Sequence, residues 1–500
     1  MNLIELLGSG ESHGGERPAL IADDHVVSYG QLGHEAGALA RHLRRLGVQP
    51  GDRVALLLPT LPEYVPAYFG ILGAGAVVVP INPRARAPEI RHIVEDCGVR
   101  SAIAHVDAVD EVRKAAANLS HLVTAGGPAP EGAVALADLV RDFEPLDPRV
   151  AKSDDLAQIC YTSGTTGKPK GVMLTHLKLA LNAESLAEAC GASLADRMLA
   201  IAPLGHILGT SLVMNMTIIS GGALVFCGKL DPDTIMGTIE RQRCTFVGAV
   251  PTVYIMMLNH PRQHDLSSLR EAMCGGASCP VEVINAFQKR FGVRILEGYG
   301  ITEIAGGAAF NPLHGLRKPG SVGVPIKYME VAILDDAGRA LGSGEVGELS
   351  IKGPTVMAGY YGQPDATRET VRDGWLRTGD LASADADGYY FIVDRKKDMI
   401  ITSGFNVYPR EVEEVLYQHP AVAEAGVVGL PDLVKGELVG ACVTLRSGEA
   451  ATAADLIAFC KDRLTPYKVP VRVEFFPALP KGATGKLLRR ELRELIAGRS

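Results

Sequence analysis

The chain has 500 residues, a net charge of −7 and 47% hydrophobic residues. That length is too great for one ordinary hydrophobic core and predicts two or more domains. The acidic balance argues against a nucleic-acid partner, because a nucleic-acid binder normally carries a basic face.

The nine cysteines run from Cys97 to Cys460 and form no CxxC pair. An odd count in a long chain argues against a disulfide framework. Residues 1–10 contain Glu5 and no basic region, so they do not resemble a signal peptide. We therefore expect reduced, mostly buried thiols in a cytoplasmic protein.

Apolar runs in the first half of the chain predict an α/β domain of parallel strands covered by helices. Residues 53–58 indicate a buried strand, 63–72 a helix and 76–80 another strand. Uninterrupted Val, Ile and Leu runs are typical of parallel sheets that are buried on both faces. The same alternation recurs around residues 222–226, 245–248 and 293–296.

The segment between Arg197 and Lys229 contains no Asp, Glu, Lys or Arg and is long enough to span a bilayer. However, Pro203, His206 and Asn215 would interrupt a spanning helix and leave polar groups in lipid. We predict a buried strand, loop and helix here, and no stable membrane insertion.

The character of the sequence changes near residue 320. Shorter strands separated by glycine-rich turns are predicted at 329–335, 347–352 and 389–393, which indicates a β-rich module over about 320–395. Five consecutive charges at 394–398 indicate a linker. We therefore expect an N-terminal domain over 1–395 and a smaller α+β domain over 396–500.

A loop rich in glycine and hydroxyl side chains follows the strand predicted at 156–161. Its glycines let the backbone approach an anion, its hydroxyls donate to phosphate oxygens, and its lysines supply positive charge. The pattern GxxxxGK(S/T) is absent, so this is not a P-loop, and a solvated hairpin is the plain alternative. The candidate triphosphate ligands are Thr162, Ser163, Gly164, Thr165, Thr166, Gly167 and Lys170.

The stretch 161–176, YTSGTTGKPKGVMLTH, resembles the signature of the adenylate-forming superfamily of acyl-CoA synthetases, luciferases and peptide-synthetase adenylation domains. Further blocks follow in the family's order, so the resemblance covers nearly the whole chain. It implies two α/β sheet subdomains plus the β-rich module, and a mobile C-terminal domain. It also implies ATP, Mg²⁺ and coenzyme A as cofactors, with an acyl-adenylate formed first and an acyl-CoA thioester second.

Two blocks resemble the family's nucleotide site. Gly275, Gly276 and Ala277 resemble the adenine-pocket turn, where small residues leave room for a flat purine. Residues 297–303, EGYGITE, resemble the block that completes the site. The resemblance implies that Tyr299 stacks on adenine beside Gly300, that Thr302 contacts the α-phosphate, and that Glu303 holds Mg²⁺, which prefers carboxylate oxygens.

Later blocks supply the ribose and catalytic contacts that the family implies. Asp380 and Arg395 resemble its ribose ligands, and Lys397 falls at its hinge. Lys486, in PKGATGK, is implied as the catalytic lysine, which neutralises charge where a carboxylate meets the α-phosphate. Gly404 is implied as a lining residue of the tunnel for the CoA thiol.

His206, in Pro203-Leu204-Gly205-His206, resembles the family's residue beside the acid substrate, although a lone His in an apolar run is often a satisfied core residue. The acid pocket is expected from 206–214, 246–250, 275–277 and 300–309. These segments contain no Lys or Arg for a second carboxylate, and small residues at 306–309 leave space. We therefore expect a small-molecule acid that is apolar, either a medium- or long-chain fatty acid or an aryl acid.

The sequence leaves three other functions open. One is loading of the acyl group onto an acyl carrier protein instead of free CoA, and another is its transfer to another specialised nucleophile. A non-catalytic nucleotide-binding protein is the third, and the full set of site residues argues against it.

Overall fold

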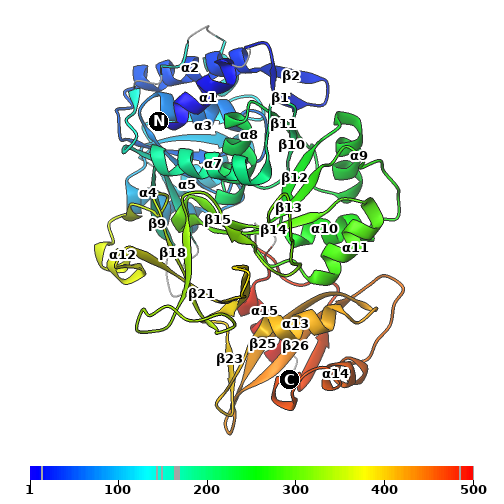
Figure 1. The fold of residues 1–500 in the computed structure, drawn as a ribbon. Helices are drawn as coiled ribbons and strands as arrows, with labels where there is room; N and C mark the ends of the chain where they lie inside the picture. Colours follow the sequence, from blue (N-terminus) through cyan, green and yellow to red (C-terminus); the bar gives the residue numbers. More distant parts are fainter. Residues whose placement is uncertain are drawn as a thin grey trace.

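The computed structural model describes residues 1–12, 15–116, 118–141, 145–147, 150–162, 169–482 and 486–498. Within these residues the strands form four sheets, three in the large N-terminal part and one in the smaller C-terminal part (Figure 1). The α/β class and the division into a large and a small domain are confirmed.

The first sheet is formed by nine described strands in the order β16-β15-β14-β13-β12-β10-β11-β1-β2. From β1 to β14 its central pairs are parallel, and β2, β15 and β16 add antiparallel edges. Its strands are β1 (Pro18–Ala22), β2 (His25–Ser28), β10 (Arg197–Ala200), β11 (Ala223–Phe226), β12 (Phe246–Ala249), β13 (Glu271–Cys274), β14 (Ile295–Ile301), β15 (Gly306–Phe310) and β16 (Val324–Pro325).

The second sheet has eight described strands in the order β19-β9-β8-β4-β3-β5-β6-β7, parallel except at β9 and β19. The strands predicted at 53–58 and 76–80 are confirmed as its parallel centre. Its strands are β3 (Arg53–Leu57), β4 (Val77–Pro80), β5 (Ser101–His105), β6 (His121–Ala125), β7 (Val134–Ala135), β8 (Leu156–Thr162), β9 (Lys170–Thr175) and β19 (Gly359–Tyr360).

The third and fourth sheets are largely antiparallel and lie in the second half of the chain. The third contains β17 (Glu330–Leu334), β18 (Gly347–Lys352), β20 (Val371–Arg372), β21 (Trp375–Ala384) and β22 (Tyr390–Arg395). The fourth contains β23 (Ile400–Thr402), β24 (Phe405–Val407), β25 (Val422–Asp432), β26 (Gly436–Leu445) and β27 (Arg472–Phe475). The proposed domain boundary at 395/396 lies at the end of β22.

Helices cover the two large sheets and pack between them (Figure 1). The α-helices are α1 (Leu3–Ser12), α2 (Tyr29–Arg45), α3 (Tyr64–Gly73), α4 (Ala87–Cys97), α5 (Val109–Ala115), α6 (Leu136–Leu139), α7 (His176–Cys190), α8 (Met216–Ile219), α9 (Pro232–Gln242), α10 (Pro251–Asn259), α11 (Val281–Phe291), α12 (Pro364–Thr370), α13 (Pro409–Tyr417), α14 (Ala453–Lys461) and α15 (Arg489–Ala497). Short 3₁₀ turns are η1 (Val106–Ala108), η4 (Thr302–Ile304) and η5 (Pro466–Lys468), and η3 (Leu208–Asn215) is a π-helix.

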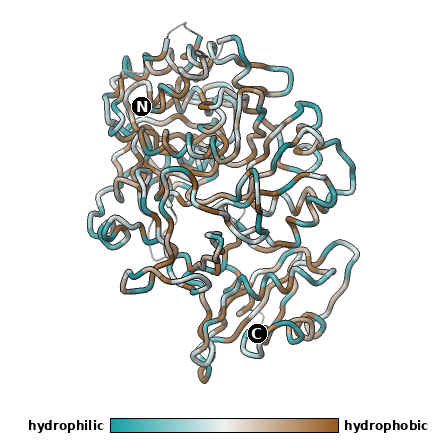
Figure 2. The backbone as a smooth tube through the Cα atoms, in the orientation of Figure 1, coloured by the Kyte–Doolittle hydropathy of each residue, from teal (hydrophilic) through white to brown (hydrophobic). Residues whose placement is uncertain are grey.

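The centre of the core lies at α3, whose ten residues are all buried. A helix that is apolar on every face is buried on every face, and here Tyr68 and Phe69 join one apolar cluster with residues of both large sheets. Hydrophobic segments run through the interior strands and hydrophilic ones over the outer loops (Figure 2). All nine cysteines are free, and eight of them are buried.

The uncharged segment between Arg197 and Lys229 forms β10, the π-helix η3, α8 and β11, which confirms the predicted buried strand, loop and helix. Asn215 and Thr210 are buried inside it. Every described helix is too short or too polar to cross a bilayer.

Candidate active site

The turn after β13 brings the two domains into contact. Gly275 is buried, Gly276 has a φ of +79° and Ala277 is exposed. A Cβ atom at Gly276 would lie 3.6 Å from Cε of Lys486 and 3.6 Å from Cγ1 of Val250. The C-terminal domain therefore brings Lys486 to the turn that sequence analysis assigned to adenine, beside an apolar residue that follows β12.

Asp380 receives contacts from two elements at the edge of this site. It lies in β21 directly opposite Arg395 of β22, whose Nε is 3.6 Å from Oδ1. Tyr299, at the end of β14, donates a hydrogen bond of 2.5 Å from its hydroxyl to Oδ2. Burial raises the pKa of Asp380, and Arg395 and Tyr299 counteract this effect. Arg395 and Tyr299 thus hold a buried carboxylate at the expected ribose position.

Glu303 lies in the short turn η4, where burial raises the pKa of its carboxyl. Its Oε1 accepts a hydrogen bond of 3.1 Å from the hydroxyl of Tyr360 in β19. The same Tyr360 ring receives Lys170, whose Nζ lies 4.9 Å from the ring centroid. Thr302 begins η4 and is buried. Tyr360 therefore connects the start of β9 to the candidate magnesium ligand.

The charge of Lys486 influences the ionisation of His206. Burial, followed by the nearby charge of Arg395, lowers the pKa of Lys486 to about 8, although Asp380 and Glu303 oppose this shift. Burial and then Lys486 lower the pKa of His206 to about 4. His206 is therefore neutral at pH 7, and Lys486 carries the positive charge.

The tautomer of His206 follows from one backbone contact. Its Nδ1 accepts a hydrogen bond of 3.3 Å from the backbone N–H of Leu208, at the start of the π-helix η3. A neutral imidazole has one N–H and one acceptor nitrogen, so the proton lies on Nε2. His206 can thus donate one hydrogen bond to an oxygen of a bound acid.

The structure brings together most of the predicted site residues that it describes. Gly300 lies where β14 meets β15, and a Cβ there would be 2.2 Å from the carbonyl oxygen of Gly306, so the position requires glycine. Lys397 follows Arg395, and burial and this arginine lower its pKa. The residues that lie close enough to Lys486 to contact it or to share its electrostatic field are Gly276, Arg395, Asp380, Glu303 and His206. Three more adjoin these residues: Gly275 precedes Gly276, Thr302 precedes Glu303, and Tyr299 binds Asp380.

Gly404 stands apart from this cluster, whereas Lys170 reaches it through Tyr360. Gly404 lies in the exposed turn between β23 and β24, and no atom lies within 4 Å of its Cβ position. Thr162 ends β8 and pairs with Lys170 at the start of β9, so these residues flank the predicted phosphate loop. The loop residues Ser163, Gly164, Thr165, Thr166 and Gly167 lie outside the described residues.

The prediction that small residues at 306–309 leave space for the acid is wrong at Gly306 and Gly307. A Cβ at Gly306 would lie 2.4 Å from Oδ1 of Asn182, and one at Gly307 would lie 2.8 Å from Cδ2 of Leu186. Asn182 also donates to the Gly307 carbonyl at 2.8 Å and accepts from its N–H at 3.1 Å. These residues are small because α7 packs against β15, and the neighbouring side chains fill the space.

Sequence reasoning missed Glu297, the first residue of the EGYGITE block. Its carboxylate accepts hydrogen bonds from the N–H groups of Cys279 and Gly320, at 3.1 and 3.0 Å. Burial raises its pKa to about 7, and Arg410 of the C-terminal domain opposes the shift. The available signal was a charged residue inside an apolar strand. Glu297 fixes the turn after β13 and faces α13.

The family follows from comparison with known proteins. Residues 9–361 match the family described as AMP-binding enzyme, and residues 411–486 match its C-terminal domain. This chain belongs to that family. A feruloyl-CoA synthase of an Amycolatopsis species is 40% identical over 472 residues, which cover 94% of each chain. A long-chain-fatty-acid–CoA ligase of Bacillus subtilis is 38% identical and covers 92% of this chain and 88% of its own.

Solved structures agree with this assignment. The anthranilate CoA ligase AuaEII, in complex with anthranoyl-AMP, has a TM-score of 0.93 at 31% identity and covers 100% of this chain and 98% of its own. ATP-bound MatB from Rhodopseudomonas palustris has a TM-score of 0.91 at 32% identity and covers 99% of each chain. The chain is an AMP-forming acid–thiol ligase, and ATP and CoA are cosubstrates of this AMP-binding class.

Proposed function

We propose that this AMP-binding enzyme joins an apolar monocarboxylic acid, of the aryl or fatty class, to coenzyme A. The observation that carries the proposal is the contact of Lys486 with the turn at Gly276, where Val250 and Leu208 also meet. The positive charge of Lys486 thus lies between an apolar wall and the carboxylates of Asp380 and Glu303. That arrangement suits a substrate with one carboxylate and an apolar body.

In the first step, a carboxylate oxygen of the acid attacks the α-phosphorus of ATP, and pyrophosphate leaves. Two anions approach each other, so the protonated Lys486 stabilises the transition state more than the ground state. The Nε2–H of His206 donates to the acid carboxylate and orients it. Asp380 and Arg395 hold the ribose, Tyr299 stacks on the adenine, and Thr302 contacts the α-phosphate.

Glu303 would hold Mg²⁺ beside the phosphates. Its donor chemistry fits, because Mg²⁺ is a hard cation that prefers carboxylate oxygens, and burial has removed much of the water that would otherwise solvate Glu303. When bound, the ion would supply charge neutralisation at the phosphate oxygens. The resemblance assigns the triphosphate to the loop between Thr162 and Lys170, most of which lies outside the described residues.

In the second step, the CoA thiolate attacks the acyl-adenylate carbonyl, and AMP leaves. We propose that the C-terminal domain rotates about Lys397 between the steps, which removes Lys486 and brings the turn at Gly404 to the thiol path. The proposal rests on the contrast between the close approach of Lys486 to the turn at Gly276 and the open surroundings of Gly404.

An acid panel tests the substrate class by pyrophosphate release, with and without CoA. Ferulate, benzoate, octanoate and palmitate represent apolar acids, and malonate, sulfoacetate and an amino acid represent charged ones. We expect release and thioester formation with at least one apolar acid and little with the charged acids. Faster pyrophosphate release with a diacid than with any apolar acid would contradict the proposed substrate class. No pyrophosphate release with any acid would contradict the ligase function.

Val250→Lys sharpens the same test. A second cation in the pocket should lower activity on apolar acids and favour malonate or sulfoacetate, because the buried ammonium requires a partner charge. Val346→Lys is the matched control, because Val346 is exposed. It should leave the preference unchanged. Equal behaviour of the two variants would remove Val250 from the acid pocket.

A second candidate differs in the acceptor. The amide bond synthetase McbA from Marinactinospora thermotolerans has a TM-score of 0.87 at 29% identity and covers 99% of each chain. An amide bond synthetase joins an acyl group to an amine, so this architecture also serves a nitrogen nucleophile. If the acid panel releases pyrophosphate without any CoA thioester, amines and an acyl carrier protein are the next acceptors to compare.

A further inference from the structure

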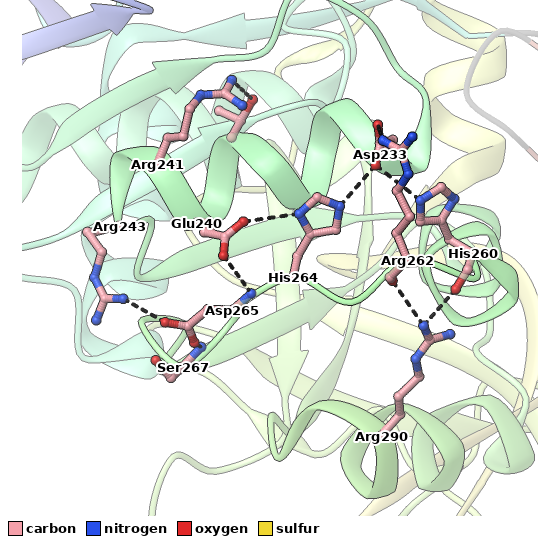
Figure 3. A network of polar contacts seen from close by, with 11 residues as sticks. Asp233, Glu240, Arg241, Arg243, His260, Arg262, His264, Asp265, Ser267 and Arg290 are labelled. Atoms are coloured by element: carbon pink, nitrogen blue, oxygen red, sulfur yellow. Dashed lines mark hydrogen bonds and ion pairs between the residues drawn. The ribbon is translucent and has the colours of Figure 1, made fainter.

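Two histidines and an aspartate, none of them a residue of the candidate active site, gather in one cluster (Figure 3). The helix α9, which carries the aspartate, lies at the edge of the N-terminal domain (Figure 1). Asp233 lies in the first turn of α9, His260 directly follows α10, and His264 lies in the loop beyond it. One ligand atom from each residue lies within 4.8 Å of the other two, and all three residues are partly buried.

The two histidine rings face the same carboxylate oxygen of Asp233. Nε2 of His260 is 3.2 Å from Oδ1 of Asp233, and Nε2 of His264 is 3.0 Å from the same atom. In a tetrahedral zinc site with ligands about 2.0 Å from the ion, neighbouring ligand atoms lie about 3.3 Å apart. The two measured separations are already close to this value.

Each of the two ring nitrogens of His264 faces a carboxylate oxygen, and this arrangement suits a bound cation. Its Nδ1 lies 3.1 Å from Oε2 of Glu240, and its Nε2 faces Asp233. An ionised carboxylate only accepts, and a neutral imidazole has one N–H, so the neutral ring satisfies one carboxylate and not both, whereas a protonated ring would donate to both. If Nδ1–H donates to Glu240, the lone pair of Nε2 faces Asp233, and a cation between them satisfies both atoms.

A layer of contacts holds these ligands in place (Figure 3). Oε1 of Glu240 accepts a hydrogen bond of 3.2 Å from the N–H of Asp265, next to His264. Arg290 of α11 donates to the carbonyl of His260 at 2.6 Å. The His264 ring packs over Gly237, where a Cβ would lie 3.7 Å from Cε1. A carboxylate behind a histidine ligand is the usual outer support of a metal site.

We propose that Asp233, His260 and His264 bind one divalent transition-metal ion of the zinc class. Imidazole with one carboxylate suits Zn²⁺, Co²⁺ or Ni²⁺, and water would complete the coordination. The ion would join α9 to the loop after α10. Because α10 begins one residue after Val250, the site would anchor the far end of a helix that starts at the proposed acid pocket.

Arg262 provides an internal competitor. Its Nη1 lies 2.8 Å from Oδ2 of Asp233, so its guanidinium already neutralises part of the carboxylate charge. A divalent ion must share Asp233 with this cation. Removing the guanidinium should therefore strengthen metal binding, which a network of hydrogen bonds without a metal would not do.

Isothermal titration of the metal-free full chain with Zn²⁺, in buffer without chelator or nucleotide, tests the proposal. We expect one ion per chain, and Co²⁺ should give the visible absorption of a site with imidazole ligands. His260→Gln and His264→Gln should abolish this binding. His314→Gln is the matched control, because His314 is exposed and lies outside the cluster. Absence of binding, or binding unchanged in both histidine variants, would overturn the site.

Two surface variants keep the test decisive if a histidine variant fails to fold. Glu240→Gln should weaken Zn²⁺ binding by about 10–100-fold, because it removes the charged support of His264. Arg262→Gln should tighten binding. If Glu240→Gln and Arg262→Gln change Zn²⁺ affinity in the same direction or not at all, the cluster is an ion-pair network and the proposal fails.

Discussion

Two loops of the C-terminal domain differ sharply in what surrounds them. Lys486 contacts the turn at Gly276, and burial lowers the pKa of its side chain. Gly404 lies in an exposed hairpin turn with no atom within 4 Å of its Cβ position. In Figure 1, β23 and its hairpin extend to the lower edge of the molecule. One loop is thus engaged with the site and the other is free of it.

The different surroundings of Lys486 and Gly404 indicate which of the two half-reactions fits this conformation. Both loops belong to one folded unit with its own core, so a rotation that brings in one loop removes the other. Under the proposed function, the engaged loop carries the charge required when the acid meets ATP. We therefore propose that this conformation is the one for adenylation, and variants of the two loops should separate the two chemical steps.

The largest effect is expected for Lys486→Ala. Acid-dependent ATP–pyrophosphate exchange should fall about 100–1,000-fold, because the charge that neutralises the transition state is lost. Thioester formation from supplied acyl-adenylate and CoA should persist. Lys481→Ala is the control in the same loop, since Lys481 forms an ion pair of 2.5 Å with Glu424. If Lys486→Ala catalysed ATP–pyrophosphate exchange at the parental rate, the catalytic role assigned to Lys486 would be wrong.

The next effect is a pH dependence of adenylation. Lys486 has its pKa lowered to about 8, so it loses its charge as the pH rises through that value. Once the pH exceeds the pKa, the charged fraction falls about tenfold per pH unit, and the exchange rate should follow it. The rate of thioester formation from supplied acyl-adenylate should not show this fall at high pH.

Lys486→Arg is the control for that pH profile, because a guanidinium stays charged throughout. Its exchange rate should be lower than that of the parent near neutral pH but flat across pH 8. A falling limb that persists in Lys486→Arg would assign the titration to another group.

A smaller, selective effect is expected for Lys397→Pro. Proline fixes φ near −65° and should restrict rotation at the proposed hinge. Exchange should stay within about twofold, whereas thioester formation should slow about tenfold, since domain motion then limits the rate. Lys397→Ala removes the charge but leaves the backbone free, so it should spare both steps. Equal losses in both steps for Lys397→Pro would reject the hinge.

Much of the fold could be predicted because its signals are local. The apolar runs at 53–58 and 76–80 predicted neighbouring parallel strands, since a strand buried on both faces needs no polar alternation. The strand predicted at 293–296 extends to Ile301, because the glycines after it allow close pairing with β15. It was the resemblance of whole blocks to the adenylate-forming superfamily, and not residue spacing, that predicted which blocks meet in the site, as Tyr299 and Asp380 do.

The remaining parts depend on partners that are distant in sequence. Tyr360 contacts Glu303 from a two-residue strand, and no local pattern distinguishes it from other tyrosines. Glu297 is stabilised partly by Arg410 of the other domain. The cluster at His264 likewise depends on Asp233, a residue of a preceding helix. Such groups become visible only when the tertiary structure places them together.

The smallest expected effect tests the free loop. Ser403 and Gly404 have φ values of +51° and +83° between β23 and β24, as in a two-residue hairpin turn of type I′. Gly404→Ala strains this backbone and should cost about 1 kcal/mol of stability. Exchange should be unchanged, and thioester formation should slow a few-fold, because the added methyl group would narrow the thiol path.

Gly388→Ala is the matched control for this variant. Gly388 has a φ of +81° and, like Gly404, no atom within 4 Å of its Cβ position. Its substitution should cause a similar loss of stability, measured by thermal unfolding, but no selective loss of thioester formation. If both variants slow the second step equally, backbone strain explains the loss at Gly404. If only Gly404→Ala does so, the open turn meets the thiol after rotation, as the contrast with Lys486 requires.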